Sequence, residues 1–252
     1  MENKIQTERK PLEILVVEDK HKDLGYFIKY LKENINTKKL KEDKFFKNHS
    51  LDYLKFANFT IATNYEDAIN ELDKDYDGLI CDFNFPGKKE SIESIKEQIK
   101  KHGNKERLYE LASKVTYLSY FGNTNLNYKD IVKGFDINQF EEKLEKNIES
   151  DHCPLGPIVS IKAKQRNIPY IFATNELFHA GDAIPLAAYV GVIDKKELLD
   201  GLHKLSMNGY TYKTIREGGG CPLTKNLAIG EKEIGVGWSL ALSLLKDKIH
   251  LE

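Results

Sequence analysis

The sequence predicts an α/β protein in which a parallel sheet carries helices on both faces. Short apolar runs rich in β-branched residues alternate along the chain with segments whose apolar residues recur every three or four positions. Three of these runs end in a carboxylate or a hydroxyl group. Parallel strands joined through helices bring their carboxyl ends to one edge, where open α/β sheets bind ligands. The pattern therefore predicts a functional site as well as a fold class.

The first half of the chain supplies three of the five expected strands. These strands are expected at 14–17, 59–62 and 78–81, and helices are expected at 24–31 and 66–72. Residues 1–10 are polar and should form a tail, and the Lys- and Asn-rich connection 35–57 should contain some helix. The third strand has the clearest pattern, because its apolar run leads to Asp82 and is then stopped by Pro86 and Gly87.

Residues 88–155 interrupt the alternation and are expected to form a helical insertion after the third strand. They contain three apolar stripes at helical spacing: Ile92, Ile95 and Ile99; Leu108, Leu111, Val115 and Leu118; Phe140, Leu144 and Ile148. We interpret these stripes as packing surface rather than as a cofactor pocket.

The alternation then resumes. Helices are expected at 158–163, 183–188 and 198–205, and strands at 168–173, leading to Thr174, and at 190–194, leading to Lys195. We therefore expect one domain over 11–205, enlarged at about 35–57 and 88–155. The extension 206–252 should pack back on that domain through the apolar stretch 234–245.

Composition narrows the class of protein. The chain has 252 residues, of which 40% are hydrophobic, and a formal net charge of -1, which gives no global argument for binding nucleic acid or an anionic membrane. No apolar run approaches the roughly 20 residues that span a bilayer, and no secretory signal is recognised at Met1. Three widely spaced cysteines favour a reducing compartment, so we expect a cytoplasmic protein.

The expected strand ends bring a chemically distinct set of groups to one edge. The set is Glu18 and Asp19, Asp82, Thr174 and Lys195. Clustered carboxylates repel one another unless a hard cation neutralises them, and Mg²⁺ prefers oxygen ligands. A carboxylate can also act as a nucleophile towards phosphorus, while a metal and an ammonium group neutralise charge on the transferred phosphoryl group. Taken alone, Asp82 would be an ordinary loop-starting Asp; the other strand ends favour a site.

Four stretches of the chain, in order, resemble the receiver domain of bacterial two-component response regulators. The stretch ILVVED at 14–19 is similar to the first strand of that family with its acidic pair, and DFNFPG at 82–87 to the phosphoacceptor strand and its Pro-Gly. The stretch IPYIFAT at 168–174 is similar to the fourth strand, and GVIDK at 191–195 to the fifth.

The resemblance implies a flavodoxin-like sheet with strand order 2-1-3-4-5 and a complete set of site residues. Asp82 would accept the phosphoryl group, Thr174 would be the switch hydroxyl, and Lys195, or its neighbour Lys196, would contact the phosphate. Mg²⁺ would be held by Glu18, Asp19, Asp82 and the backbone carbonyl of Asn84. The family's aromatic switch position falls here on Val192 or Ile193, which departs from the pattern.

The first functional hypothesis is a stand-alone signalling switch. It would take phosphate from a histidine kinase or phosphotransfer protein, act through a downstream protein or a second copy of itself, and have at most autophosphatase activity. The second is a degenerate receiver that serves as a protein-binding module. A third, less favoured, is a haloacid-dehalogenase-type phosphatase. That family has a second Asp two positions after the nucleophile, where this chain has Asn84, and its acidic pair follows the nucleophile, whereas Glu18 and Asp19 precede it.

Overall fold

The computed structural model describes residues 11–19, 57–115, 134–174, 182–194, 196, 221–224, 227–229 and 236–249. The first elements are β1 (Leu12–Val17), β2 (Ala57–Ala62), α3 (Tyr65–Glu71), β3 (Gly78–Cys81), the short 3-10 turn η2 (Lys89–Ser91), α4 (Ile92–His102) and α5 (Lys105–Val115). The remaining elements are α7 (Ile137–Asn147), α8 (Gly156–Gln165), β4 (Tyr170–Thr174), α9 (Ala183–Tyr189), β5 (Cys221–Thr224), β6 (Leu227–Ile229) and α12 (Val236–Ile249). The helices expected at 24–31 and 198–205 lie outside the described residues, as does Lys195.

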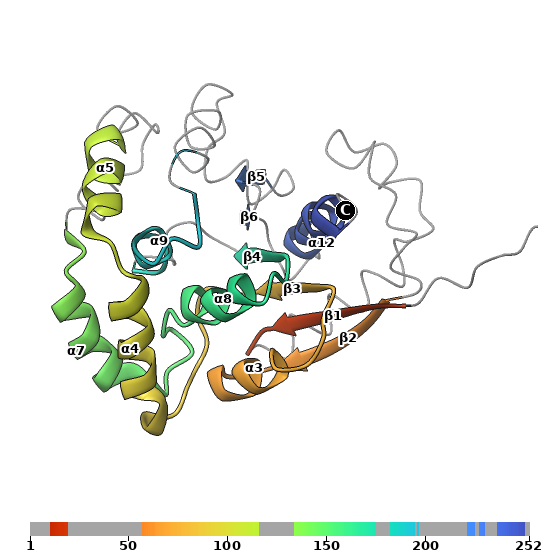
Figure 1. The fold of residues 1–252 in the computed structure, drawn as a ribbon, viewed down its shortest axis with the longest axis horizontal. Coiled ribbons are helices and arrows are strands. Elements are labelled where there is room, and N and C mark those ends of the chain that lie inside the picture. Colours follow the sequence, from red (N-terminus) through yellow and green to blue (C-terminus); the bar gives the residue numbers. More distant parts are fainter. Residues whose placement is uncertain are drawn as a thin grey trace, which may run out of the picture.

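The described strands form one sheet in the order β2-β1-β3-β4-β6-β5 (Figure 1). The parallel order 2-1-3-4 of the first four strands is the one expected from the sequence. β6 pairs in parallel with β4, and β5 closes the described edge as an antiparallel partner of β6. The arrowheads of the parallel strands point towards the side of the molecule that carries α9, α4 and α7.

The strand expected at 190–194 is wrong. These residues end α9 instead: the Gly191 amide donates to the Ala188 carbonyl at 3.1 Å, and the Val192 amide donates to the Ala187 carbonyl at 2.9 Å. This is the Schellman pattern of a helix C-terminus, and it places Gly191 in the left-handed region with φ +75. The apolar run that resembled a strand is buried because it packs behind the helix end, and the place beside β4 is taken by β6.

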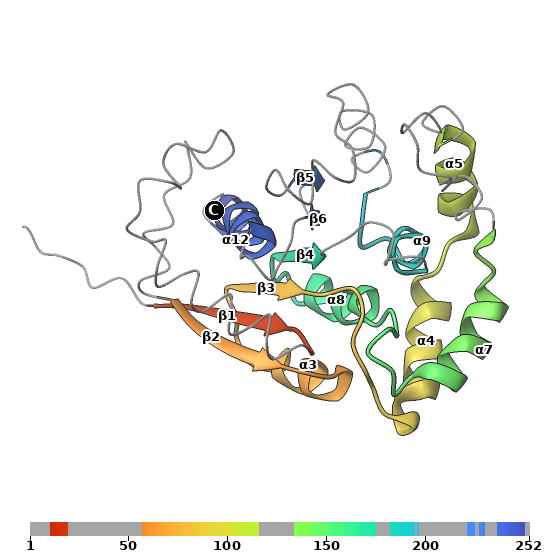
Figure 2. The same cartoon turned by 180° about the vertical axis from the view of Figure 1, so that it is seen from behind.

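Helices cover both faces of the sheet (Figure 2). On one face α3, α8 and α9 pack with the inward side chains of the strands into a large core, which includes Leu15, Leu79 and Phe172. On the other face α12 contributes five buried residues, Trp238, Leu240, Ala241, Leu242 and Leu245, to a second core with Ile14, Val16, Ile80, Ile171 and Ala173. Successive side chains of β1 point to opposite faces of the sheet, so Leu15 and Val17 belong to the first core and Ile14 and Val16 to the second. This is the pattern of a sheet that is buried on both faces.

The three helices α4, α5 and α7 lie together at one end of the molecule, beyond α9. Their positions match the apolar stripes in the sequence, and the inward residues Ile95, Ile99, Phe140 and Leu144 are almost fully buried in the larger core. The described helices of the segment therefore share the core of the sheet.

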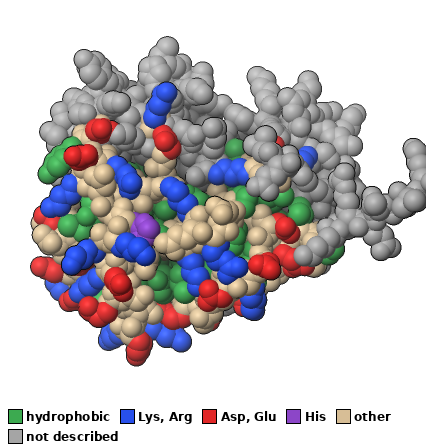
Figure 3. Space-filling view, viewed as in Figure 1, with side chains coloured by type: hydrophobic (Ala, Val, Ile, Leu, Met, Phe, Trp, Pro, Cys, Tyr) green, Lys and Arg blue, Asp and Glu red, His purple; other side chains and the backbone are tan. Residues whose placement is uncertain are grey.

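On the face seen in Figure 3, Lys and Arg side chains are interspersed with Asp and Glu over the described part of the surface. No helix in the described ranges is both long enough and apolar enough to cross a membrane.

Candidate functional site

The candidate site lies where β1 and β3 end side by side. Val17 is paired with Cys81 in the parallel ladder, so the residues that follow them, Glu18 and Asp82, leave the sheet at the same level. The ladder continues one step further, because the Asp82 amide donates to the Val17 carbonyl at 3.0 Å and the Glu18 amide donates to the Ala62 carbonyl at 3.0 Å. The backbones of Glu18 and Asp82 are therefore still hydrogen-bonded to the sheet at the residues that carry the carboxylates.

The structure brings three of the predicted site residues into one cluster. One carboxylate oxygen from each of Glu18, Asp19 and Asp82 lies within 4.8 Å of the others. Glu18 is completely buried, whereas Asp19 and Asp82 are half-buried. We refer to these three residues as the acidic cluster. Their proximity follows from the sequence, because Glu18 and Asp19 are the first two residues after β1 and Asp82 is the first residue after β3 of the same parallel sheet.

The orientation of the Asp82 carboxylate is set by the next residue. The Phe83 amide donates to Oδ1 of Asp82 at 2.7 Å. The Phe83 ring is fully buried and stacks on Phe172 of β4, with the ring centroids 4.6 Å apart. A buried aromatic anchor thus holds the peptide group that binds the carboxylate.

The loop after Asp82 is fastened on two sides. Towards α3, the Tyr65 amide donates to the Pro86 carbonyl at 2.9 Å, and the Lys88 amide donates to Oε1 of Glu66 at 2.9 Å. Towards the segment that enters α8, three backbone hydrogen bonds form a short ladder. They run from Gly156 N to Phe83 O at 3.0 Å, from Phe85 N to Cys153 O at 3.0 Å, and from Gly87 N to Ile148 O at 2.7 Å. The two ends of the helical segment 88–155 are therefore held next to each other beside the acidic cluster.

The other predicted site residues are only partly located. Thr174 is the last residue of β4 and is buried, with 5% of its surface exposed. Asn84 lies half-buried in the loop two positions after Asp82. Lys195 falls outside the described residues, and the strand that was expected to deliver it to the sheet edge is the helix end at 190–193.

The donor set of the acidic cluster fits a hard divalent cation. It offers only carboxylate oxygens, with carbonyl oxygens of the following loop nearby in sequence, and this is the chemistry that Mg²⁺ selects. Oδ1 of Asp19 is buried, so at least one oxygen of the cluster is shielded from bulk water. Glu18, Asp19 and Asp82 are the residues that would hold such an ion.

A cavity of about 450 Å³ lies elsewhere, between α4, α7 and the end of α9. Its lining includes Lys96, Glu97, Ile99, Glu141 and Tyr189. Burial, followed by the nearby charge of Glu141, raises the pKa of the Tyr189 hydroxyl. The cavity mixes apolar and charged groups but contains none of the acidic cluster.

Sequence reasoning missed two residues that shape the site, Phe83 and Gly156. Phe83 gave no signal beyond its apolar character. Gly156 precedes Pro157, and a Gly-Pro pair before an apolar run is a recognisable helix-start signal, but its contact with the backbone of Asp82 is a feature of the tertiary fold.

Comparisons with protein-family models, with curated proteins and with solved structures find no match to this chain.

Proposed function

We propose that this protein is a divergent receiver of a two-component system, in which Asp82 accepts a phosphoryl group. The observation that supports this most directly is the acidic cluster: Glu18, Asp19 and Asp82 meet at the carboxyl edge of a parallel sheet of order 2-1-3-4. The next strand in that order, β4, ends in a buried Thr174.

In the proposed reaction, a carboxylate oxygen of Asp82 bonds to the phosphorus of a phosphohistidine. The P–N bond of the donor breaks, and its electron pair remains on the imidazole nitrogen, which takes up a proton. The Phe83 amide holds Oδ1 of Asp82, so the carboxylate approaches phosphorus in a fixed orientation.

Glu18 and Asp19 would hold Mg²⁺ together with Asp82 and the backbone carbonyl of Asn84. The ion supplies charge neutralisation for the phosphoryl oxygens when it is bound. The Thr174 hydroxyl would donate to a phosphoryl oxygen, and Lys195 or Lys196 would contribute an ammonium group to the same oxygens.

The proposal extends to the domain arrangement, the cellular compartment and the partners of the protein. The chain would be a flavodoxin-like domain with insertions at about 35–57 and 88–155, in which the described part of 206–252 supplies β5, β6 and α12. It would act in the cytoplasm as a stand-alone switch, receiving phosphate from a histidine kinase or phosphotransfer protein. It would signal to a protein partner or to a second copy, without contacting nucleic acid or membrane. Cys81 and Cys153 are buried as thiols rather than as a disulfide, which suits a reducing compartment.

One observation favours a second candidate, a degenerate receiver that binds a protein partner without cycling phosphate. The described residues before Lys195 end a helix rather than forming the strand that was expected to lead to this lysine. All seven residues of α9 are buried, and the helical segment packs against its end through Asn104, Arg107 and Phe135.

Phosphorylation with a small donor separates the two candidates. The folded protein is incubated with acetyl phosphate and Mg²⁺, and its intact mass is measured; we expect one base-labile adduct of one phosphoryl group. Asp82→Asn should abolish the adduct, while Asp77→Asn, a change at an acid just before the same strand, should leave it unchanged. An adduct that persists in Asp82→Asn contradicts the assignment, and a folded, Mg²⁺-saturated wild type that never gains one supports the degenerate receiver.

A further inference from the structure

The first turn of α8 lies directly on the backbone of the phosphoacceptor loop. A Cβ atom built on Gly156 would stand 2.2 Å from the carbonyl oxygen of Asp82 and 3.0 Å from the Cα atom of Phe83. Both atoms belong to the backbone, so no change of rotamer can relieve the contact. Glycine is therefore required here because the two backbones approach closely. Its conformation is not the reason, because its φ is outside the left-handed region.

A short chain of hydrogen bonds links this contact to the Asp82 carboxylate. The Gly156 amide donates to the Phe83 carbonyl at 3.0 Å, and the Phe83 amide donates to Oδ1 of Asp82 at 2.7 Å. The carbonyl group of Phe83 is thus bound to the start of α8, and its amide group is bound to the Asp82 carboxylate. A movement of Gly156 relative to the sheet would be passed to the carboxylate through a single residue.

We infer that Gly156 is a positioning residue for Asp82: its missing side chain lets α8 hold the Phe83 peptide where the Asp82 carboxylate meets Glu18 and Asp19. The inference rests on the proposed function for the chemistry that it affects. The close approach of Gly156 to the backbone of Asp82 and Phe83 does not depend on that function, because it follows from the fold alone.

The surroundings give the contact little freedom to adjust. Pro157 restricts the backbone at the start of α8, and the next residues, Ile158 and Val159, are buried in the core. On the other side, Asp82 is hydrogen-bonded to β1 through its own amide. An added methyl group must therefore displace the loop, and a displacement on the order of 1 Å can cost about 100-fold in a reaction that depends on positioning.

The test compares Gly156→Ala with two matched glycine substitutions. Gly134→Ala places its Cβ where no atom lies within 4 Å. Gly103→Ala produces a severe overlap at 2.3 Å, but with the ring of Tyr189 at the far end of α4. The first variant controls for the loss of a glycine, and the second controls for a steric defect in the core that does not touch the Asp82 loop.

Three quantities are measured for each protein: the unfolding temperature, the apparent affinity for Mg²⁺ by calorimetry, and the rate of acetyl phosphate modification at saturating Mg²⁺. We expect Gly156→Ala to weaken Mg²⁺ binding about tenfold and to slow modification by ten- to 100-fold. Gly103→Ala should also lose thermal stability, though less because the Tyr189 ring can shift, and should keep both the affinity and the rate. A folded Gly156→Ala variant that loses stability but keeps the wild-type affinity and rate, as the Gly103 variant does, would overturn the inference.

Amide NMR spectra decide the inference even if the proposed function fails. If the wild type neither binds Mg²⁺ nor accepts phosphate, Gly156→Ala should still shift the amides of Asp82, Phe83, Glu18 and Asp19, while Gly103→Ala should not. Shifts confined to α8 would count against a positioning role. If Gly156→Ala does not fold, Pro157→Ala loosens the same turn without a clash and should shift the same four amides to a smaller extent. Their invariance in that folded variant would also refute the inference.

Discussion

At the scale of single residues, the groups around the acidic cluster differ in how far sequence could locate them. Glu18, Asp19 and Asp82 could be predicted to meet because they lie within two residues of the end of a buried run, and parallel strands end at one edge. Gly156 could not, because its role depends on a backbone contact with a residue that is distant in the chain. Cys153 is a similar case: its carbonyl accepts a hydrogen bond from the Phe85 amide, and its side chain is buried beside that loop.

Burial raises the pKa of the Cys153 thiol from 9.0 to about 12, and burial, followed by the charge of Glu66, raises the pKa of the Tyr65 hydroxyl from 10.0 to about 12. In both cases the folded state holds the proton more tightly than the unfolded chain. Stability is therefore fully present below pH 9 and is lost as pH rises towards 12. We expect the contribution of these two groups to the free energy of unfolding to fall by about 1.4 kcal/mol per pH unit above pH 9 and about twice as steeply above pH 10.

Urea unfolding at a series of alkaline pH values measures this slope. Cys153→Ala should remove the decline in stability between pH 9 and 10. Tyr65→Phe should leave that interval unchanged and should roughly halve the decline that these two groups cause above pH 10. A wild-type stability that is constant from pH 8 to 11 would contradict the prediction for both groups.

At the scale of elements, sequence periodicity located the described helices well, but it misassigned the run 190–193 and missed β5 and β6. The run 190–193 is apolar and β-branched, but Gly191 within it follows a helical pattern and is better interpreted as a helix C-terminus. β5 and β6 were not predicted because they have only four and three residues, too few for alternation to be recognised. Their pairing with β4 is a non-local feature.

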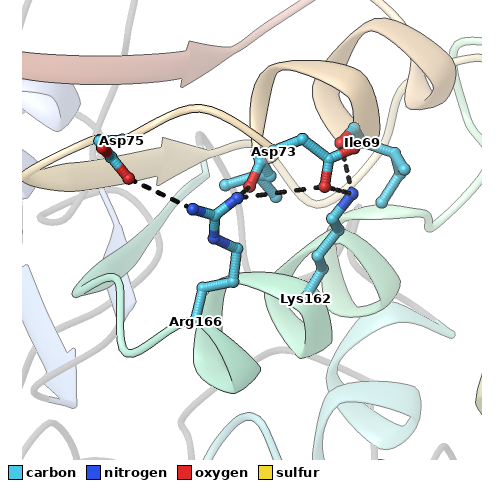
Figure 4. Close-up of polar contacts among 6 residues, drawn as sticks. Ile69, Asp73, Asp75, Lys162 and Arg166 are labelled. Carbon is cyan, nitrogen blue, oxygen red and sulfur yellow. Dashed lines mark hydrogen bonds and ion pairs between the residues drawn. The ribbon is translucent and has the colours of Figure 1, made fainter.

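α8 fixes the neighbouring α3 through two cationic side chains (Figure 4). Lys162 donates to the Ile69 carbonyl at 2.8 Å, and Arg166 donates to the Leu72 carbonyl at 2.6 Å. Both carbonyls lie at the C-terminal end of α3, where the helix dipole favours positive charge. The nearby Asp73 carboxylate forms ion pairs with both cations. The hydrogen bond from Lys162 is the main reason that the pKa of the Asp73 carboxyl group is lowered.

We expect Arg166→Ala to destabilise the protein by about 1–2 kcal/mol, because a charged hydrogen bond to the Leu72 carbonyl is lost and the end of α3 is left without that donor. The matched control is Asp75→Ala, which removes only the fully exposed partner of the same guanidinium group and should have no measurable effect. Chemical denaturation compares the two variants with the wild type. Equal effects would show that the exposed ion pair, rather than the contact with the helix end, determines the contribution of Arg166.

At the scale of the whole molecule, the C-terminal part of the chain belongs to the core. The sequence led us to expect that 206–252 packs back on a domain ending at 205, and the described part of this region adds two strands to the sheet and α12 to its second face. α12 buries Trp238 and Leu245 completely, and Leu245 lies against Gly78 of β3, where an added Cβ would stand 2.8 Å from its side chain. The strand that leads to Asp82 is thus packed against the C-terminal helix.

This packing predicts that the region 11–205 cannot be isolated by truncation. Removing 206–252 would expose the face formed by Ile14, Val16, Ile80, Ile171 and Ala173, and a sheet with one apolar face uncovered does not remain a cooperative, monomeric fold. We expect the truncated chain to aggregate or to lose its cooperative thermal transition. In the full-length chain, Leu245→Ala should cost about 2–5 kcal/mol, whereas Leu244→Ala, at a half-buried neighbour, should cost less. Calorimetry and size-exclusion chromatography measure these effects. A truncated protein that unfolds cooperatively as a monomer, at a temperature close to that of the wild type, would show that the sheet is stable without α12. The C-terminal region would then be a separable extension.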